Sequence, residues 1–196
     1  GLNEAVNAIA VDSNPLYAGG LFTQNNNATV VNYISKFDQT WKCMGSGPDP
    51  GLNGEVFSLE LDGTNVVAGG LFTNDMNNND PPIQYITEYN ETKNTFAPLL
   101  DPEIFPYGVN GPLNAVVTDG TYVYVGGKFS KVAGIKAMNV ARYHIGNKEW
   151  EALTGTLTGT ITSNGEGVGG TVNALHLFNG DLYIGGSFSD VIGKVV

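Results

Sequence analysis

The residues best suited to binding a metal lie in one short segment, 75–80, which reads DMNNND. Carboxylate and amide oxygens at alternating positions are typical of Ca²⁺ loops, so Asp75, Asn77, Asn79 and Asp80 are the candidate ligands. The EF-hand pattern also requires Gly at its sixth position and Glu at its twelfth, where this segment has Asp80 and Ile86. We therefore favour a polar surface loop over a calcium site.

Other residues with catalytic potential are few and scattered. His144 and His176 fall in different parts of the chain and Cys43 is the single cysteine, whereas zinc and copper sites need three or four converging donors. The motifs Gly-x-Ser-x-Gly, His-Glu-x-x-His and Cys-x-x-Cys do not occur. A glycosidase needs two carboxylates about 5 to 10 Å apart, a separation that a sequence does not give. We predict no catalytic residue and no cofactor.

Composition and modification motifs point away from nucleic acid and towards the cell exterior. The net charge of −10 would repel phosphate backbones and anionic membrane surfaces. No uninterrupted apolar run reaches the roughly 18 to 20 residues that span a bilayer. Two sequons make Asn27 and Asn90 candidate glycosylation sites. With only 14% charged residues, the chain is predicted to be secreted or at the cell surface, with no nucleic-acid partner and no membrane insertion of its own.

One pattern returns four times along the chain and indicates how these residues are positioned. The repeats begin at Gly1, Gly51, Gly108 and Gly167, which are 50, 57 and 59 residues apart. This spacing is close to the roughly 40 to 50 residues of a propeller blade, with extra loop length. A helical period of 3.6 residues appears nowhere at length. The repeats predict an all-β chain, a β-propeller with blades at 1–50, 51–107, 108–166 and 167–196.

Each complete repeat reads as four short antiparallel strands. The first is apolar, at 6–11, 56–61, 113–118 and 172–177, and a turn rich in Asp, Asn and Gly follows it. The second strand carries a Gly-Gly-x-Phe signature, and the third is predicted at 33–37, 85–89 and 140–143. The last repeat has only 30 residues. We therefore predict three complete blades plus half a fourth, as a piece of a larger propeller in a longer polypeptide.

The Gly-Gly-x-Phe signature is interpreted as a packing element and not as a nucleotide site. Glycine weakens a strand, so its return at one position indicates that a side chain does not fit there. No helix is predicted to follow and present its N-terminus to phosphate. We expect neighbouring blades to approach closely at these glycines and the fourth-strand aromatics to pack as wedges between sheets. The structural signature comprises Gly19, Gly20, Phe22, Gly69, Gly70, Phe72, Gly126, Gly127, Phe129, Gly185, Gly186, Phe188, Trp41, Phe96 and Trp150.

The repeat resembles two known families. Kelch-type propeller repeats share the layout carried here by Leu16, Tyr17, Gly19, Gly20, Phe37, Asp38 and Trp41. A closer resemblance is to the fungal cortical cell-polarity marker (bud-site selection) family of large membrane-anchored surface proteins. Its motifs are matched by Gly167 to Leu175, Gly185 to Ser189, Asn139 to Tyr143 and Trp150 to Leu153. The resemblance covers essentially the whole chain and implies a surface landmark or adhesion protein. The second repeat departs from the pattern at Phe57 and Phe96.

Loop lengths indicate where a partner would bind. The loops between second and third strands, at 24–29, 74–82 and 131–136, are longer than the other turns within a repeat, and the inter-blade connections are longer still. In an up-and-down blade both classes emerge on one face, and loops on a rigid scaffold usually carry recognition. The leading hypothesis is a non-enzymatic extracellular propeller that binds a protein or glycan through this face. A structural part of an extracellular or virion assembly and a glycan-active enzyme are the alternatives.

Overall fold

The computed structural model describes residues 1–77, 82–99, 108–153, 167–188 and 191–192. Every regular element in these ranges is a strand and none is a helix, which confirms the all-β prediction for the described part of the chain. Accordingly, no described helix is long and apolar enough to cross a membrane.

Three repeats each form a four-stranded antiparallel sheet with its strands in chain order, and no sheet closes on itself. The first sheet contains β1 (Val6–Ala10), β2 (Leu16–Gly20), β3 (Ile34–Asp38) and β4 (Thr40–Cys43). The second contains β5 (Val56–Asp62), β6 (Asn65–Gly70), β7 (Ile86–Asn90) and β8 (Thr95–Ala97). The third contains β9 (Leu113–Thr118), β10 (Tyr122–Gly127), β13 (Val140–His144) and β14 (Glu149–Ala152).

The fourth repeat contributes two long strands, β16 (Thr171–Phe178) and β17 (Asp181–Ser187), which pair with each other. Two short strand pairs complete the described fold. One is the hairpin of β11 (Lys131–Val132) and β12 (Ile135–Lys136), and the other pairs β15 (Gly167–Val168) with β18 (Val191–Ile192), which flank β16 and β17 in the chain.

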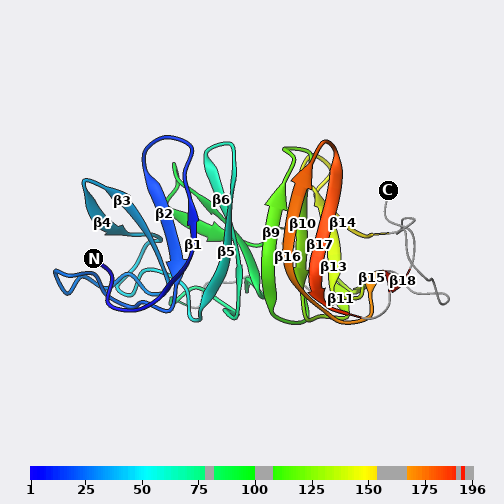
Figure 1. The fold of residues 1–196 in the computed structure, drawn as a ribbon. Coiled ribbons are helices and arrows are strands. Elements are labelled where there is room, and N and C mark those ends of the chain that lie inside the picture. The colour runs from blue at the N-terminus through cyan, green and yellow to red at the C-terminus, as the bar shows by residue number, and fades with distance from the viewer. Residues whose placement is uncertain (78–81, 100–107, 154–166, 189–190, 193–196) are drawn as a thin grey trace.

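The sheets follow one another in space as they do along the chain (Figure 1). Strand β1 lies beside β5, β5 beside β9, and β9 beside β16, so the first strand of each repeat contacts the first strand of the next. The apolar core is divided accordingly. Separate clusters fill the spaces between the first and second, second and third, and third and fourth sheets, and a small cluster covers the outer side of the first sheet.

The two glycines of the signature are required for different reasons. A β-carbon on Gly69 would lie 2.8 Å from Val116 Cγ2 and 3.2 Å from Leu113 Cβ in the next sheet, and one on Gly19 or Gly126 would overlap a valine of the next sheet, Val56 or Val172. This confirms the close approach of neighbouring sheets that the sequence predicted. The second glycine lies against the backbone of its own sheet. A β-carbon there would overlap a carbonyl oxygen at the start of the first strand, beside a β-bulge: that of Ala5, Glu55, Pro112 or Thr171.

The aromatic residues of the fourth strands pair with a third-strand aromatic in each complete sheet, at ring-centroid distances of 5.2 to 5.3 Å. Phe96 joins the core between the first and second sheets and Trp150 the core between the second and third, as predicted for wedges. Trp41 differs from the prediction. It is half-buried against Phe22 and Val31 on the outer side of the first sheet, because no described sheet precedes its own.

The third strands begin one residue later than predicted in the first two sheets. Tyr33 and Tyr85 adopt φ values of 67° and 62°, which is left-handed backbone, so the strands start at Ile34 and Ile86. Bulky residues rarely adopt this conformation, and β-propensity alone therefore placed both tyrosines inside the strands.

Candidate functional site

The long loops lie together on one end of the sheets, hereafter the loop face. The start of each complete repeat bridges the loop after its second strand, through Leu2 with Asn25, Leu52 with Asp75, and Val109 with Val132. This confirms that the two classes of loop share one face. In Figure 1 the loop face is at the bottom, and the turns that join β1 to β2 and β5 to β6 are at the top.

An asparagine near the start of each complete repeat holds the loop face in shape. Asn110 Oδ1 accepts hydrogen bonds from the amides of Ser130 and Lys131, both at 2.9 Å, and its Nδ2 donates to the Ser130 hydroxyl. Asn3 and Asn53 make the same bonds to residues 23–24 and 73–74. The fourth repeat has Gly169 at this position. The loops therefore leave the second strand on a fixed path.

Asp75 and Asn77 of the candidate metal segment take part in local hydrogen bonds. Asp75 is buried, and its Oδ1 accepts the Asn77 amide at 3.0 Å, as Asn25 Oδ1 accepts the Asn27 amide in the first repeat. Asn77 Nδ2 donates to the carbonyls of Ser46 and Asp49. Asn79 and Asp80 lie outside the described residues. In the described ranges no three His, Cys, Asp or Glu side chains are grouped to hold a metal ion.

Basic residues gather in the third repeat, a feature that the whole-chain charge concealed. Five of the nine basic residues lie between Asp119 and Glu149, and that stretch contains no acidic residue. Two of the five lie away from the loop face: Arg142 pairs with Glu151 at 2.7 Å, and Lys148 is exposed beside a cavity between the sheets. The other three belong to the loop face. Charge counted repeat by repeat would have revealed this segregation from the sequence.

The hairpin β11–β12 presents these lysines to solvent. Lys131 and Lys136 are exposed and stand directly opposite each other across the two strands, and Lys128 is exposed just before them. Like charges opposite one another in an antiparallel pair are destabilising. Ile135 is 42% exposed but stands opposite the buried Val132, on the other side of the hairpin from Lys131 and Lys136. We refer to Lys128, Lys131 and Lys136 as the lysine patch, which can bind an anionic group.

The two sequons occupy different surroundings. Asn27 is exposed in the loop after β2. Asn90 ends β7, where its Nδ2 donates to Asn65 Oδ1 and its Oδ1 accepts the Lys93 amide. An attached glycan would thus leave freely from Asn27 but would require rearrangement around Asn90.

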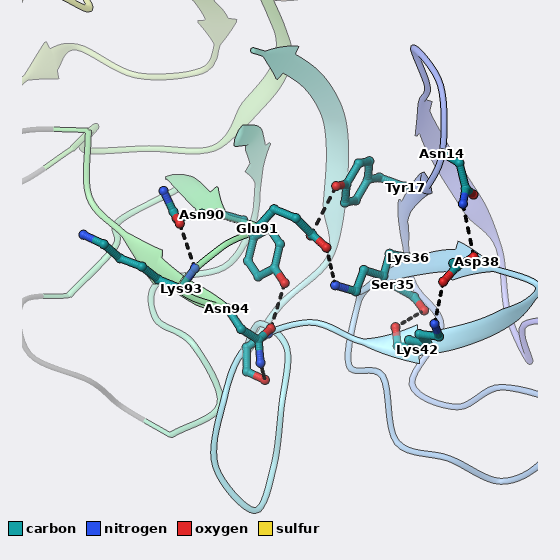
Figure 2. Close-up of polar contacts among 12 residues, drawn as sticks. Asn14, Tyr17, Ser35, Lys36, Asp38, Lys42, Asn90, Glu91, Lys93 and Asn94 are labelled. Carbon is teal, nitrogen blue, oxygen red and sulfur yellow. Dashed lines mark hydrogen bonds and ion pairs between the residues drawn. The ribbon is translucent and has the colours of Figure 1, made fainter. Parts of the chain in front are cut away.

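Glu91, in the middle of the second sequon, links the first two sheets (Figure 2). Its carboxylate accepts hydrogen bonds from Lys36 Nζ at 2.6 Å and from the Tyr17 hydroxyl at 3.2 Å. Burial and, secondarily, Glu91 raise the pKa of Tyr17 to about 12. Nearby, Asp38 accepts from Asn14 and Lys42 within the first sheet. These groups are satisfied by each other, which indicates a structural network.

Two cavities lie between sheets at the opposite end from the loop face. One, of about 240 Å³, is lined by the β1–β2 and β5–β6 turns together with Tyr17 and Glu91. The other, of about 220 Å³, includes Asp62 and Glu88, and burial raises the pKa of Asp62. The histidines are elsewhere: His144 packs edge-on against Tyr122 and accepts the Asn147 amide, whereas His176 is exposed on β16.

Comparison with known proteins supports the fold and leaves function open. No protein-family model and no curated protein sequence matches the chain. Among solved structures, the chain is similar to the computationally designed Ika4 protein, at 15% identity and a TM-score of 0.51 over 95% of this chain and 88% of that one. It is also similar to the computationally designed Ika8 protein, at 12% identity and a TM-score of 0.50 over 96% of this chain and 47% of that one, so it spans about half of Ika8. At these identities the likeness is one of fold.

Proposed function

We propose that this chain is built of β-propeller blades, three complete ones and two strands of a fourth, and that it is a non-enzymatic binding module at the cell surface or outside the cell. The propeller is supported by three sheets of identical strand order whose first strands lie side by side. Radial repetition of such sheets is the architecture of a propeller.

The binding surface in this proposal is the loop face, and the partner is a protein or glycan that carries clustered carboxylates or sulfates. The observation that carries it is the lysine patch, a cationic surface on a chain whose net charge is −10. Charges at the rim of an interface act mainly on partner choice and association rate. The clamps at Asn3, Asn53 and Asn110 pre-order the loops, which lowers the entropy lost on binding.

An extracellular role as a polarity landmark or adhesion protein follows from the resemblance of the repeats to the fungal cortical marker family. The exposed position of the Asn27 sequon agrees with it, because glycan transfer requires an accessible loop. A secreted fusion examined for glycan at Asn27 would test this location separately from binding.

Binding can be tested with anionic probes of two kinds. The chain would be applied to an array of uronic-acid, sulfated and neutral glycans, and titrated with a polyglutamate peptide. We expect binding to anionic probes that weakens as salt rises. The double variant Lys131→Glu/Lys136→Glu should weaken it by about tenfold or more, given about 1 to 2 kcal/mol from the two charges.

The control is Lys93→Glu, which reverses one charge, half of the change in the double variant, at an exposed lysine in the β7–β8 turn, at the opposite end of the sheets. It should bind as the wild type does. Binding to no anionic probe, or equal loss in both variants, would contradict a role for the lysine patch.

A further inference from the structure

The first sheet exposes an apolar surface that every later sheet buries. Val6, Ile9 and Val11 are 43%, 60% and 56% exposed, and Phe37 is 38% exposed. Their counterparts one repeat later pack against the first sheet, where Val56 and Tyr89 are fully buried and Leu59 is 6% exposed. We refer to the surface formed by Val6, Ile9, Val11 and Phe37 as the leading face.

The fourth repeat exposes the opposite half of the same contact. Side chains alternate along a strand, so Tyr183 and Gly185 of β17 point to one side, as Tyr17 and Gly19 do in β2. Tyr17 is 5% exposed because the second sheet covers it, whereas Tyr183 is 55% exposed and Phe178 is 57% exposed. We refer to the surface formed by Ala174, His176, Phe178, Tyr183 and Gly185 as the trailing face.

The leading and trailing faces are complementary, because the chain already forms the same contact between its own sheets. At each internal contact a valine of the next sheet occupies the space over the first signature glycine: Val56 over Gly19, Val116 over Gly69, and Val172 over Gly126. Among the described residues, the nearest neighbour of a β-carbon on Gly185 is Ala174 Cβ, 3.8 Å away within the same sheet. No described side chain therefore fills the space over Gly185, and Val6, at the repeat position of Val56, has no such glycine opposite it among the described residues.

A polar contact repeats alongside the apolar one. Asn7 Nδ2 donates to the Val56 carbonyl at 3.0 Å, and Asn114 Nδ2 donates to the Val172 carbonyl at 2.9 Å. Asn173 stands at the same repeat position on the trailing face and is exposed. The acceptor that corresponds to it is the carbonyl of Val6 on the leading face.

We propose that two copies of this chain associate head to tail, with the leading face of one seated on the trailing face of the other. Val6 and Ile9 of one copy lie over Gly185 of its neighbour, and Asn173 Nδ2 donates to the Val6 carbonyl. The occupant is a second copy because the same chain carries both halves of a contact that it already forms three times internally. Association through two different surfaces is heterologous, so further copies can add at the free faces until the ring closes.

The first test is sedimentation velocity of the chain over a concentration series. The wild type should associate, and Ile9→Asp or Gly185→Val should weaken association by about tenfold or more. Both variants should remain folded, which far-ultraviolet circular dichroism would verify, because Ile9 is exposed and no described side chain fills the space over Gly185. Leu71→Asp is the control, since Leu71 is as exposed as Val6 but lies on neither face.

Mixing the two defective variants gives a sharper test. An Ile9→Asp copy retains its trailing face and a Gly185→Val copy retains its leading face, so an equimolar mixture should form heterodimers with one intact contact. Wild-type chains that stay monomeric, variants that associate normally, or a mixture that forms no heterodimer would each overturn the proposal. The lysine patch lies in the third repeat and Ile9 in the first, with the second sheet between them, so Ile9→Asp should still bind anionic probes and a failure of either proposal is recognisable.

Discussion

The first glycine of each signature offers a comparison between nearly identical sites that differ only in whether a neighbouring sheet is present. Gly126→Ala would place a methyl group 3.1 Å from Val172 Cβ and 3.2 Å from Leu175 Cγ and would overlap Val172 Cγ1. Val172 is fully buried and belongs to a strand of the next sheet, so relief requires the sheets to separate. Overpacking of this kind costs about 1 to 3 kcal/mol, and we expect the upper part of that range.

Gly185→Ala introduces the same methyl group at the corresponding position of β17, where the nearest described atom is 3.8 Å away. Alanine in place of glycine stabilises a strand by roughly 0.5 to 1 kcal/mol through reduced entropy of the unfolded chain. The same gain applies to Gly126→Ala, so the free energies of unfolding of the two variants should differ by the cost of overpacking, about 2 to 3 kcal/mol. Urea unfolding at low protein concentration measures this difference. Equal destabilisation, or a more stable Gly126→Ala variant, would refute the reasoning that neighbouring sheets exclude the side chain.

Three further predictions follow from local contacts. Asn110→Ala should lower the free energy of unfolding by about 1 to 2 kcal/mol, because the amides of Ser130 and Lys131 lose their acceptor. Amide hydrogen exchange at both residues should become faster. Asn110→Asp keeps an acceptor oxygen and should retain most of the protection. Burial is the main reason that the pKa of Tyr17 and of Tyr124 is raised to about 12. Their contribution to the free energy of unfolding is therefore complete below pH 10 and is lost between pH 10 and about 12. In the double variant Tyr17→Phe/Tyr124→Phe, the free energy of unfolding should fall less over that pH range. In a secretory host, glycan should be found mainly at Asn27, and mass spectrometry showing occupancy chiefly at Asn90 would contradict the contrast in their surroundings.

The sequence was most informative where the repeats agree. The recurrence of Gly-Gly at one position predicted the close approach of neighbouring sheets. At Gly69, an added β-carbon would lie only 2.8 Å from Val116 Cγ2 of the next sheet. The recurrence did not distinguish the different roles of the two glycines. The role of Gly70 depends on a β-bulge that brings the Glu55 carbonyl close to it, and a bulge cannot be recognised from the pattern of apolar residues.

Features that depend on a neighbour were harder to predict. Trp41 carries the same signature as Trp150, yet only Trp150 has a preceding sheet to pack against. The lysine patch was missed because charge was summed over the whole chain. Alignment of the repeats would have shown that Asp75 stands where Asn25 does, which favours a turn-forming role over metal binding for that residue.

The central claim, that the loop face is the binding surface, can be tested most directly by hydrogen exchange with and without a saturating anionic probe. The account predicts protection of the β11–β12 hairpin and of the amides held by Asn110, with unchanged exchange in the β5–β6 turn at the opposite end. Protection confined to that turn, or to the cavity beside Tyr17 and Glu91, would contradict it.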